Sequence, residues 1–165
     1  MDIRDATEAD LAGLTAIYNE VIATSTAVYR EEPVSLEERR RWWQAHRAQG
    51  YPVLVAQAAD GLGGFASFAD FRSPPGYRFT VEHTVHVRAA ARGRGIGSAL
   101  VQALLARAAA LGKHVMIAGV DAGNGAAIRF HERLGFERSG LLREVGYKFG
   151  RRLDLVFLQR RIAPG

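Results

Sequence analysis

Residues 90–108 read AARGRGIGSALVQALLARA, a run in which three glycines among arginines lead directly into an alanine- and leucine-rich helix pattern. Glycine lets the main chain come close to a ligand, and the free N–H groups at a helix N-terminus attract anions. A tight turn into the helix is the plainer alternative, but it does not need three glycines within five residues. The stretch therefore predicts a phosphate-binding loop, and its flanks must decide which phosphate compound it holds.

Two familiar phosphate motifs fit this loop poorly. A P-loop nucleotide hydrolase needs a lysine directly after its last glycine, whereas Gly97 is followed by Ser98. A dinucleotide-binding fingerprint could use Gly93 and Gly95, with Asp121 as the acid for the ribose. That fingerprint belongs to the first strand–helix unit of its fold, however, and only residues 98–165 follow the loop here. Both motifs are therefore disfavoured.

Hydrophobic periodicity around the loop predicts a fold of the α/β (α+β) class. Strands are expected at 3–4, 52–58, 63–71, 80–87, 114–120, 136–149 and 151–161, with helices after Thr7, after Ser35, after the glycine loop and at 127–134. Thr7 with Asp10, and Ser35 with Glu38, are capping-box signatures for the first two helices. Because three consecutive strands precede the loop, we expect a mixed, mostly antiparallel, twisted sheet rather than a doubly wound parallel one.

Composition narrows the class of protein further. The 165 residues are 48% hydrophobic and 24% charged, which is ordinary for one globular domain. There is no cysteine, which excludes disulfides, thiolate metal sites and cysteine nucleophiles. The N-terminal MDIRDATEAD lacks the apolar core of a signal peptide, and no apolar run reaches the roughly 18 residues of a membrane span. We expect a soluble, cytoplasmic protein that needs no metal.

The net charge of +5 raises the question of nucleic-acid binding. Lysine occurs only at positions 113 and 148, so 20 of the 22 basic residues are arginine. These arginines form short, scattered clusters instead of the dense, aromatic-interleaved stripe of a single-strand binder. We expect a general attraction for anionic ligands and no nucleic-acid or membrane partner.

Arg92, Gly95 and Gly97 form a pattern that resembles the Q/R-x-x-G-x-G/A motif of the GNAT superfamily of N-acetyltransferases. In that family the amides of the loop hold the pyrophosphate of acetyl-CoA. The preceding TVEHTVHV (80–87) looks like the fourth strand of the family, and GNGAAIRFHERLGF (123–136) looks like its second coenzyme A motif. The order of elements also agrees, so the resemblance implies a single GNAT domain over residues 1–165 with helices on both faces of the sheet.

A narrower resemblance covers residues 3 to about 160. ATSTAVYREEPVS (23–35), TVEHTVHV and GYKFGRRLDLVFLQ (146–159) look like the phosphinothricin and methionine sulfoximine N-acetyltransferases. Those enzymes acetylate the α-amino group of glutamate-like amino acid analogues. The resemblance therefore implies a small amino acid or analogue as the acceptor.

Acetyl-CoA is the cosubstrate that the resemblance implies. Its pantetheine would pair with strand 80–87 as an added strand does, and a main-chain N–H near Val85 would polarise the thioester carbonyl. The residues that the resemblance assigns to coenzyme A are Val85, His86, Val87, Arg92, Gly93, Arg94, Gly95, Ile96, Gly97, Ser98, Asn124 and Arg133. A helix N-cap for Asn124 and a solvated charge for Arg133 are the structural alternatives.

Acetyl transfer to an amine needs a base, because an amine of lysine-like basicity has a pKa near 10 and is protonated in water. Glu82 is the candidate, since alternation along the strand places Glu82, Thr84 and His86 on one polar face. A bulge, which this strand usually carries in the family, would shift that phase and bring His83 into the site. A salt bridge or cap at the strand end is the alternative role for Glu82.

His131 stands where many members of the superfamily carry a tyrosine that protonates the departing coenzyme A thiolate. Histidine at this place matches the narrower family, and a pKa near neutrality suits an acid. Packing on the helix face beside Phe130 and Leu134 is the alternative.

A free amino acid also carries a carboxylate, which an arginine binds through two parallel hydrogen bonds. Arg72 is the first candidate, with Arg78 on the other side of the same loop and a surface charge as the alternative. The residues expected to bind the acceptor are Arg72, Ser73, Pro74, Glu82, His83 and Thr84. Tyr29 either lines the acceptor pocket or only packs against its neighbours, and Trp42 and Trp43 are expected to have packing roles.

Tyr147, Lys148 and Phe149 lie in the terminal hairpin, which in this family often pairs with a second subunit, so a homodimer is expected. The sequence thus predicts an acetyl-CoA-dependent N-acetyltransferase that works by direct attack in a ternary complex. Without cysteine, no acetyl-cysteine intermediate can form. Two alternatives stay open: a member of the family acting on another amine, such as a protein N-terminus or polyamine, and a non-catalytic coenzyme A-binding module.

Overall fold

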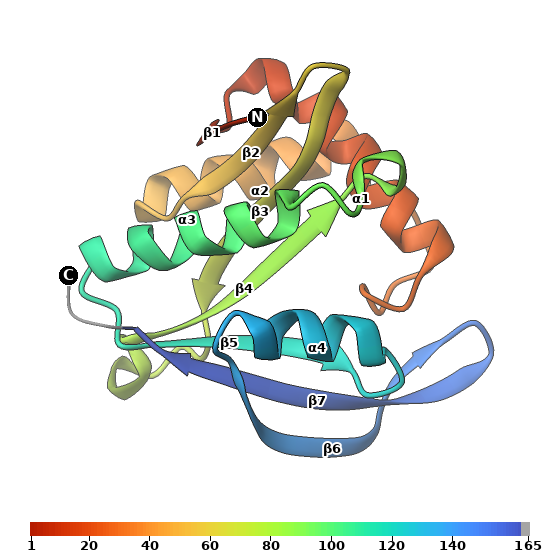
Figure 1. Cartoon of the computed structure of the whole chain (residues 1–165), viewed down its shortest axis with the longest axis vertical. Helices are drawn as coiled ribbons and strands as arrows, with labels where there is room; N and C mark the ends of the chain where they lie inside the picture. Colours follow the sequence, from red (N-terminus) through yellow and green to blue (C-terminus); the bar gives the residue numbers. More distant parts are fainter. Residues whose placement is uncertain (163–165) are drawn as a thin grey trace.

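The computed structural model describes residues 1–162, which form a seven-stranded sheet with helices on both faces (Figure 1). The strands are β1 (Asp2–Asp5), β2 (Val53–Ala58), β3 (Gly61–Asp70), β4 (Thr80–Val87), β5 (Val115–Asp121), β6 (Glu137–Lys148) and β7 (Arg151–Arg161). The helices are α1 (Leu11–Thr24), α2 (Leu36–Gln49), α3 (Ile96–Ala110) and α4 (Gly125–Arg133), with short 3-10 turns η1 (Glu8–Asp10), η2 (Pro75–Tyr77) and η3 (Ala89–Ala91). The expected fold class is confirmed.

The strands lie in the order β1-β2-β3-β4-β5-β7-β6. Neighbouring strands are antiparallel except β4 and β5, which are parallel because the helix α3 connects them. The mixed, mostly antiparallel sheet predicted from the element order is therefore present.

Local signals in the sequence determine where the first two helices begin. Thr7 and Asp10 form the expected capping box, and the η1 turn that they enclose leads into α1. At the second helix, the Ser35 hydroxyl accepts a hydrogen bond from the Glu38 N–H at 3.0 Å, and Gly50 ends α2 with a φ of 77°. Within residues 1–162, no helix combines the length and the apolar character that crossing a bilayer requires.

Two apolar cores hold the helices against the sheet. On one face, α3 and α4 bury side chains such as Leu100 and Ile128. On the other face, α1 and α2 bury Leu14 and Trp43 against Phe65 of β3. The expected packing role of Trp43 is thus confirmed, and each face of the sheet carries its own pair of helices.

The sheet opens in its middle. β4 and β5 pair only at residues 80–82 and 115–117, and then the two strands diverge (Figure 1). Beyond this point β4 continues to pair with β3, and β5 continues to pair with β7. We call the opening between residues 83–87 and residues 118–121 the fork. It leaves one edge of β4 free next to the start of α3.

Candidate active site

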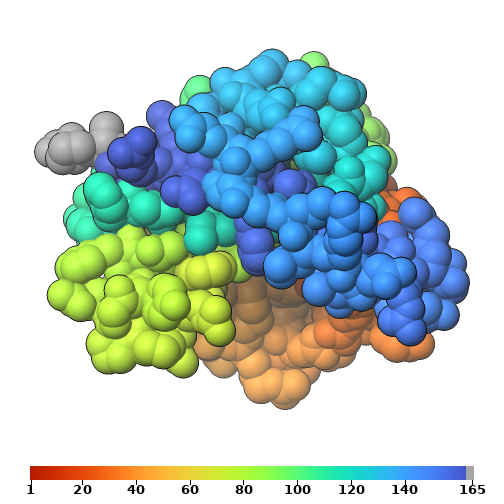
Figure 2. All heavy atoms as spheres, turned by 90° about the horizontal axis from the view of Figure 1, so that it is seen from below, coloured from red at the N-terminus to blue at the C-terminus, as the bar shows by residue number. Residues whose placement is uncertain are grey.

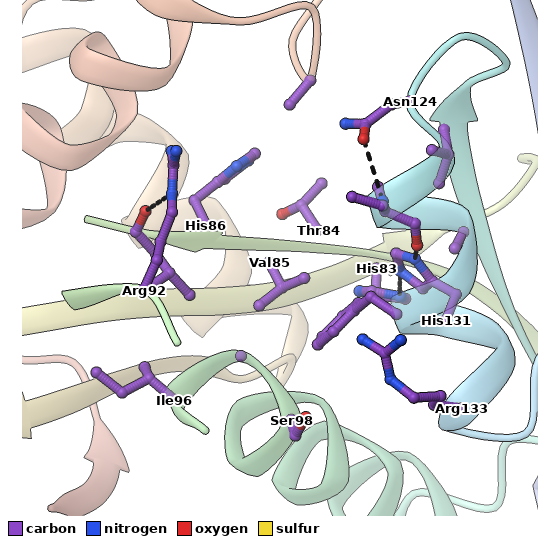
Figure 3. A pocket seen from close by; sticks show the side chains of 18 of the residues that line it. His83, Thr84, Val85, His86, Arg92, Ile96, Ser98, Asn124, His131 and Arg133 are labelled. Carbon is purple, nitrogen blue, oxygen red and sulfur yellow. Dashed lines mark hydrogen bonds between the residues drawn. The ribbon is translucent and has the colours of Figure 1, made fainter. Parts of the chain in front are cut away.

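A cavity of about 590 Å³ lies at the fork (Figure 3). It brings together these residues that the sequence predicts for the site: His83, Thr84, Val85, His86, Val87, Arg92, Gly93, Gly95, Ile96, Gly97, Ser98, Asn124, His131 and Arg133. Outside its lining are Arg72, Ser73, Pro74, Glu82 and Arg94. The sequence reasoning did not assign nine further lining residues to the site: Ala27, Ala91, Ala118, Gly119, Val120, Asp121, Ala126, Ala127 and Phe130. Four of them, residues 118–121, line the cavity because β5 diverges from β4 there.

The glycine loop turns its main chain toward this cavity. Gly93 and Gly95 have φ values of 75° and 77°, in the left-handed region that favours glycine. α3 begins directly afterwards, and its first turn contains no acidic side chain that would compete for the free N–H groups. At Gly97, a Cβ would lie 3.2 Å from the Phe130 ring, so glycine there lets α3 and α4 approach each other. This geometry suits an anionic group.

The two loop arginines are arranged differently. Arg92 lines the cavity, and its Nε donates to the Val87 carbonyl at 3.4 Å (Figure 3). Arg94 is exposed and donates to the Ala90 carbonyl at 3.0 Å, with Asp60 at 3.9 Å. Of the two, Arg92 is therefore the one placed at the cavity.

The register of β4 shows which way its side chains point. Its pairing with β3 runs without a shift from Val81 to Val87, so the bulge that would change the phase is absent. Val85 packs toward the core under α3, whereas His86 contacts Phe65 on the opposite face. The alternation predicted from the sequence is thus confirmed. At the fork, the free main-chain groups of β4 and side chains from both of its faces meet in one cavity.

Glu82 is the last residue of β4 that pairs with β5, so it stands at the base of the fork. Its side chain is half-buried beside Gly119, where a Cβ would come within 3.1 Å of Oε2. Burial raises the pKa of the Glu82 carboxyl above its ordinary value, and no basic group contributes an opposing shift. A carboxylate in such surroundings is a stronger base than one in water.

His83 and His131 form a buried pair on the cavity wall. The His131 Nδ1 lies 2.7 Å from the Ala127 carbonyl, and the two Nε2 atoms are 3.2 Å apart. Because a carbonyl only accepts, Nδ1 of His131 carries the proton, and neutral His131 accepts at Nε2 from His83. Burial lowers the pKa of both rings, that of His83 to about 3. The pair is therefore neutral at physiological pH.

His86 makes the stability of the fold depend on pH. Its ring is buried against Tyr18 and Phe65, and burial, followed by the charge of Arg39, lowers the pKa of His86 from 6.5 to about 4. Because the folded pKa is the lower one, this stability is fully present above pH 6.5 and is lost as the pH falls toward 4, by roughly 3 kcal/mol. We expect the urea midpoint to fall across this range, and to fall less in His86→Phe. Equal slopes in both proteins would contradict the prediction.

A second hollow lies on the α1/α2 side of the fork. Figure 2 shows it between the β3–β4 loop (yellow-green), α2 (orange) and β6 (blue). Arg72, Ser73 and Pro74 are exposed in that loop, and the Arg72 guanidinium carbon lies 5.7 Å from the centre of the Tyr77 ring. The loop that carries these residues borders the hollow in Figure 2, and none of the three lines the cavity at the fork.

The α1–α2 loop (residues 25–35) borders the cavity at Ala27, and the contacts that hold it include two from the β6–β7 hairpin. The Lys148 Nζ of β6 donates to the carbonyls of Ile22, Ser25 and Val28 at 2.7, 2.7 and 2.8 Å. The Tyr29 hydroxyl donates to the Asp154 carbonyl at 3.2 Å.

Gly146 makes room for this loop. A Cβ at Gly146 would lie 2.3 Å from the ring of Tyr29, so only glycine allows the two segments to pack. The sequence reasoning missed both anchors of the loop, although a lysine in a chain that otherwise uses arginine was a usable signal.

Comparison with known proteins connects this geometry to a family. The model of the acetyltransferase (GNAT) family matches residues 14–136. The chain is 52% identical over 163 residues to the L-methionine sulfoximine/L-methionine sulfone acetyltransferase of Pseudomonas paraeruginosa, covering 98% of this chain and 95% of that protein. It is 39% identical to the phosphinothricin N-acetyltransferase of Streptomyces coelicolor, covering 97% and 95%.

A solved structure extends the comparison. An acetyltransferase of Salmonella typhimurium, determined with its cofactor acetyl-CoA, has a TM-score of 0.95 to this chain. The two sequences are 42% identical, and the alignment covers 100% of this chain and 95% of that one. Sequence and fold thus point to the same family over the whole described chain.

Proposed function

The chain belongs to the acetyltransferase (GNAT) family and is an acetyl-CoA-dependent N-acetyltransferase, and we propose that its acceptor is the α-amino group of a small amino acid or analogue. Acceptors of the methionine sulfoximine, methionine sulfone or phosphinothricin type are proposed, since these are the substrates in the names of its relatives. We assign residues 1–165 to one such domain. The observation that carries the proposal is the fork, with a carboxyl of raised pKa at its base.

The residues around the cavity fit acetyl-CoA. The free edge of β4 offers main-chain groups to a pantetheine arm, and Gly93, Gly95 and the first turn of α3 offer N–H groups to a pyrophosphate. Ile96, Gly97 and Ser98 line the same end of the cavity. When bound, the cosubstrate supplies an acetyl thioester, and the residues of the chain hold that thioester in place at the fork.

Two side chains of the α4 region complete this proposed binding site. The Asn124 side-chain oxygen caps α4 by accepting from the Ala127 N–H at 3.1 Å, which leaves its amide hydrogens for the pantetheine (Figure 3). Arg133 lines the cavity and is proposed to meet the phosphates. Arg94 is assigned a weaker, long-range attraction because it is exposed and lies near Asp60. The N-cap and coenzyme A roles of Asn124 are therefore compatible.

Glu82 is the proposed base. It takes a proton from the ammonium of the acceptor, directly or through a water, and the neutral amine attacks the acetyl carbon at the fork. A main-chain N–H at Val85 is proposed to stabilise the oxyanion, a contribution of about 3 kcal/mol for one such donor. The amide bond forms as the carbon–sulfur bond breaks, the thiolate leaves with the electron pair, and the second proton of the nitrogen passes to the thiolate, directly or through a water. Both substrates are present together, so the proposed reaction is a direct transfer.

His131 is the proposed proton donor to that thiolate, but its hydrogen bonds require that it first take up a proton. Nε2 must carry a proton before it can give one, yet in the neutral pair this atom accepts from His83. A thiol has a pKa near 8.5, so the thiolate is a fair leaving group without an acid. We therefore assign His131 a small assisting role, in which it acts only after taking up a proton.

The carboxylate of the acceptor is proposed to bind Arg72 at the rim of the hollow, with Ser73, Pro74 and Thr84 around it. Arg72→Ala is expected to raise KM for methionine sulfone by about 10- to 100-fold with little change in kcat, because it removes a charged hydrogen bond made in the ground state. Steady-state kinetics at saturating acetyl-CoA measure this. Arg78→Ala, in the same loop, is the matched control. If Arg78→Ala raised KM more than Arg72→Ala, Arg78 would be the residue that binds the carboxylate.

The proposed function is tested by release of free thiol from acetyl-CoA across a panel of amino acids, sulfones, polyamines and peptides. We expect turnover with methionine sulfone, methionine sulfoximine or phosphinothricin, with the product acetylated on the α-nitrogen by mass spectrometry. Preference for a peptide N-terminus or a polyamine would overturn the choice of acceptor. Binding of coenzyme A without turnover on any amine would support a non-catalytic module instead.

A homodimer is also proposed. The β6–β7 hairpin exposes large apolar side chains, namely Leu141, Leu142, Val145, Tyr147 and Phe149, which a second copy could cover. Light scattering should then give about twice the chain mass of 18.0 kDa, and Val145→Glu should give the single mass. We place the enzyme in the cytoplasm, with acetyl-CoA and a small amine as its ligands and no nucleic-acid or membrane partner.

A further inference from the structure

Three consecutive arginines of α2 differ in their partners. Arg40 pairs with Glu8 and Glu37 at 3.1 and 2.9 Å, and Arg41 lies 3.7 Å from Glu37. Arg39 is only 6% exposed, and it forms no ion pair with any carboxylate in the described part of the chain. Its buried Nε also lacks a hydrogen-bond partner among residues 1–162. Arg39 is thus a buried cation without an anion.

Such a group is hard to explain by stability alone. Removing a guanidinium from water is costly unless a partner compensates it, and an apolar side chain of similar volume is often equally stable or more stable. The buried Lys148 shows the usual solution, with three carbonyl oxygens around its ammonium. Arg39 has no equivalent set, so an incoming group is the natural candidate for its partner.

The position of Arg39 indicates where that group would come from. Its guanidinium carbon lies 3.8 Å from the centre of the Tyr18 ring and 4.3 Å from that of Trp42, contacts that hold the guanidinium plane. The Tyr18 ring in turn lies 5.5 Å from His86, which lines the cavity on the same face of β4 as Thr84. Arg39 therefore lies on the acceptor side of the fork, in the helix that forms one wall of the hollow in Figure 2.

Within residues 1–162, no neighbouring carboxylate pairs with this charge. Glu38, the adjacent acid, is paired with Arg30 at 2.8 Å. His86 is neutral above about pH 4, as its low pKa requires. Among the described residues, Arg39 thus presents a buried guanidinium without a carboxylate partner, held against two aromatic rings on the acceptor side of the fork.

We propose that Arg39 binds the oxygen-bearing end of the acceptor side chain and so selects amino acids with a sulfone, sulfoximine or phosphinate group. The inference rests on the proposed function. An acceptor whose amine lies at the fork would extend its side chain along β4 from Thr84 to His86, a strand distance of about 7 Å, and so approach the Tyr18 ring that adjoins Arg39. Two acceptor atoms on one sulfur or phosphorus, namely two oxygens in a sulfone or phosphinate and an oxygen with an imine nitrogen in a sulfoximine, match the two parallel N–H groups of a guanidinium. A thioether has no such oxygens.

Arg39→Met tests this with two acceptors that differ only in those oxygens, methionine sulfone and methionine. We expect kcat/KM for the sulfone to fall by about 10- to 100-fold, as for loss of a charged hydrogen bond, and that for methionine to change far less. The melting temperature should stay the same or rise, because an uncompensated buried charge is removed. Arg47→Met, on the same helix and 4.8 Å from the Trp43 ring, is the matched control and should leave both acceptors unaffected.

Equal losses for the two acceptors, or no loss for either, would overturn the role of Arg39. If Arg39→Met does not fold, Arg39→Lys is the second test, because lysine keeps the charge but not the paired N–H groups. A loss of kcat/KM for the sulfone alone supports the proposal, and an equal loss for both acceptors overturns it. A wild-type enzyme that prefers methionine to its sulfone would also overturn it. A wild-type enzyme that acetylates neither amino acid would instead overturn the proposed function on which it rests.

Discussion

Glu82→Gln is expected to lower kcat by about 100-fold or more while leaving the affinity for acetyl-CoA unchanged, because a general base contributes on the order of 10²–10⁴ to the rate. Glutamine keeps nearly the same shape at the base of the fork but cannot take the ammonium proton. Thiol release measures kcat, and calorimetry measures the binding of acetyl-CoA. Glu37→Gln, an exposed change on α2, is the control and should have no effect on either quantity.

The dependence of kcat on pH tests the role of Glu82 in a second way. The base works when deprotonated, so the wild-type rate should rise with pH through the raised pKa of Glu82, above its ordinary 4.5. Glu82→Gln should lose that rise. A folded pKa above the unfolded one also means that ionising Glu82 costs stability as the pH rises past 4.5, so the variant should be at least as stable at pH 7. A wild-type rate in the variant between about pH 6 and 9 would remove Glu82 from the mechanism.

Lys148→Met is expected to reduce the free energy of unfolding by about 3–5 kcal/mol, because each buried acceptor left without a donor costs about 1–3 kcal/mol. The three carbonyls that the ammonium serves, at Ile22, Ser25 and Val28, would be left without their donor. For a chain of this size, that loss corresponds to a melting temperature lower by about 10 °C. KM for the amino acid should also rise, since the loop at residues 25–35 loses its anchor.

Lys113→Met is the matched control, because lysine occurs nowhere else in the sequence. The Lys113 ammonium donates to the Tyr51 hydroxyl and the Arg78 carbonyl, both at 2.7 Å, in a partly exposed position. We expect a loss of about 1 kcal/mol there, and no change in kinetics. Similar losses in both variants would show that the burial of Lys148 and its loop contacts have no special weight.

The parts of the site that follow from local rules could be predicted from the sequence. The glycine loop can be recognised in the sequence because only glycine adopts the left-handed conformation of Gly93 and Gly95 at little cost. The face occupied by Glu82 follows from the two-residue period of a strand, and the unshifted pairing of β3 with β4 confirmed that phase. Asn124 was ambiguous between a cap and a ligand, and it caps α4 in the structure.

The remaining parts depend on contacts between distant segments, which no local pattern encodes. The approach of Tyr29 to Gly146 joins residues more than a hundred positions apart, and so does the clamp made by Lys148. The hydrogen bond between His83 and His131 is equally non-local, and it alters the proton available to His131. Arg39 is the first of three adjacent arginines, and the sequence does not show which of the three is buried.

The divergence of β4 and β5 opens a slot in the sheet, which otherwise separates the α3/α4 side of the molecule from the α1/α2 side. The thioester is expected to arrive from the side of α3 and α4, and the amine from the side of α1 and α2, so neither molecule has to displace the other. Each product can withdraw the way it came, which favours sequential kinetics without an obligatory order. A compound that inhibits by linking both substrates would have to pass through the slot and would therefore be slow to dissociate.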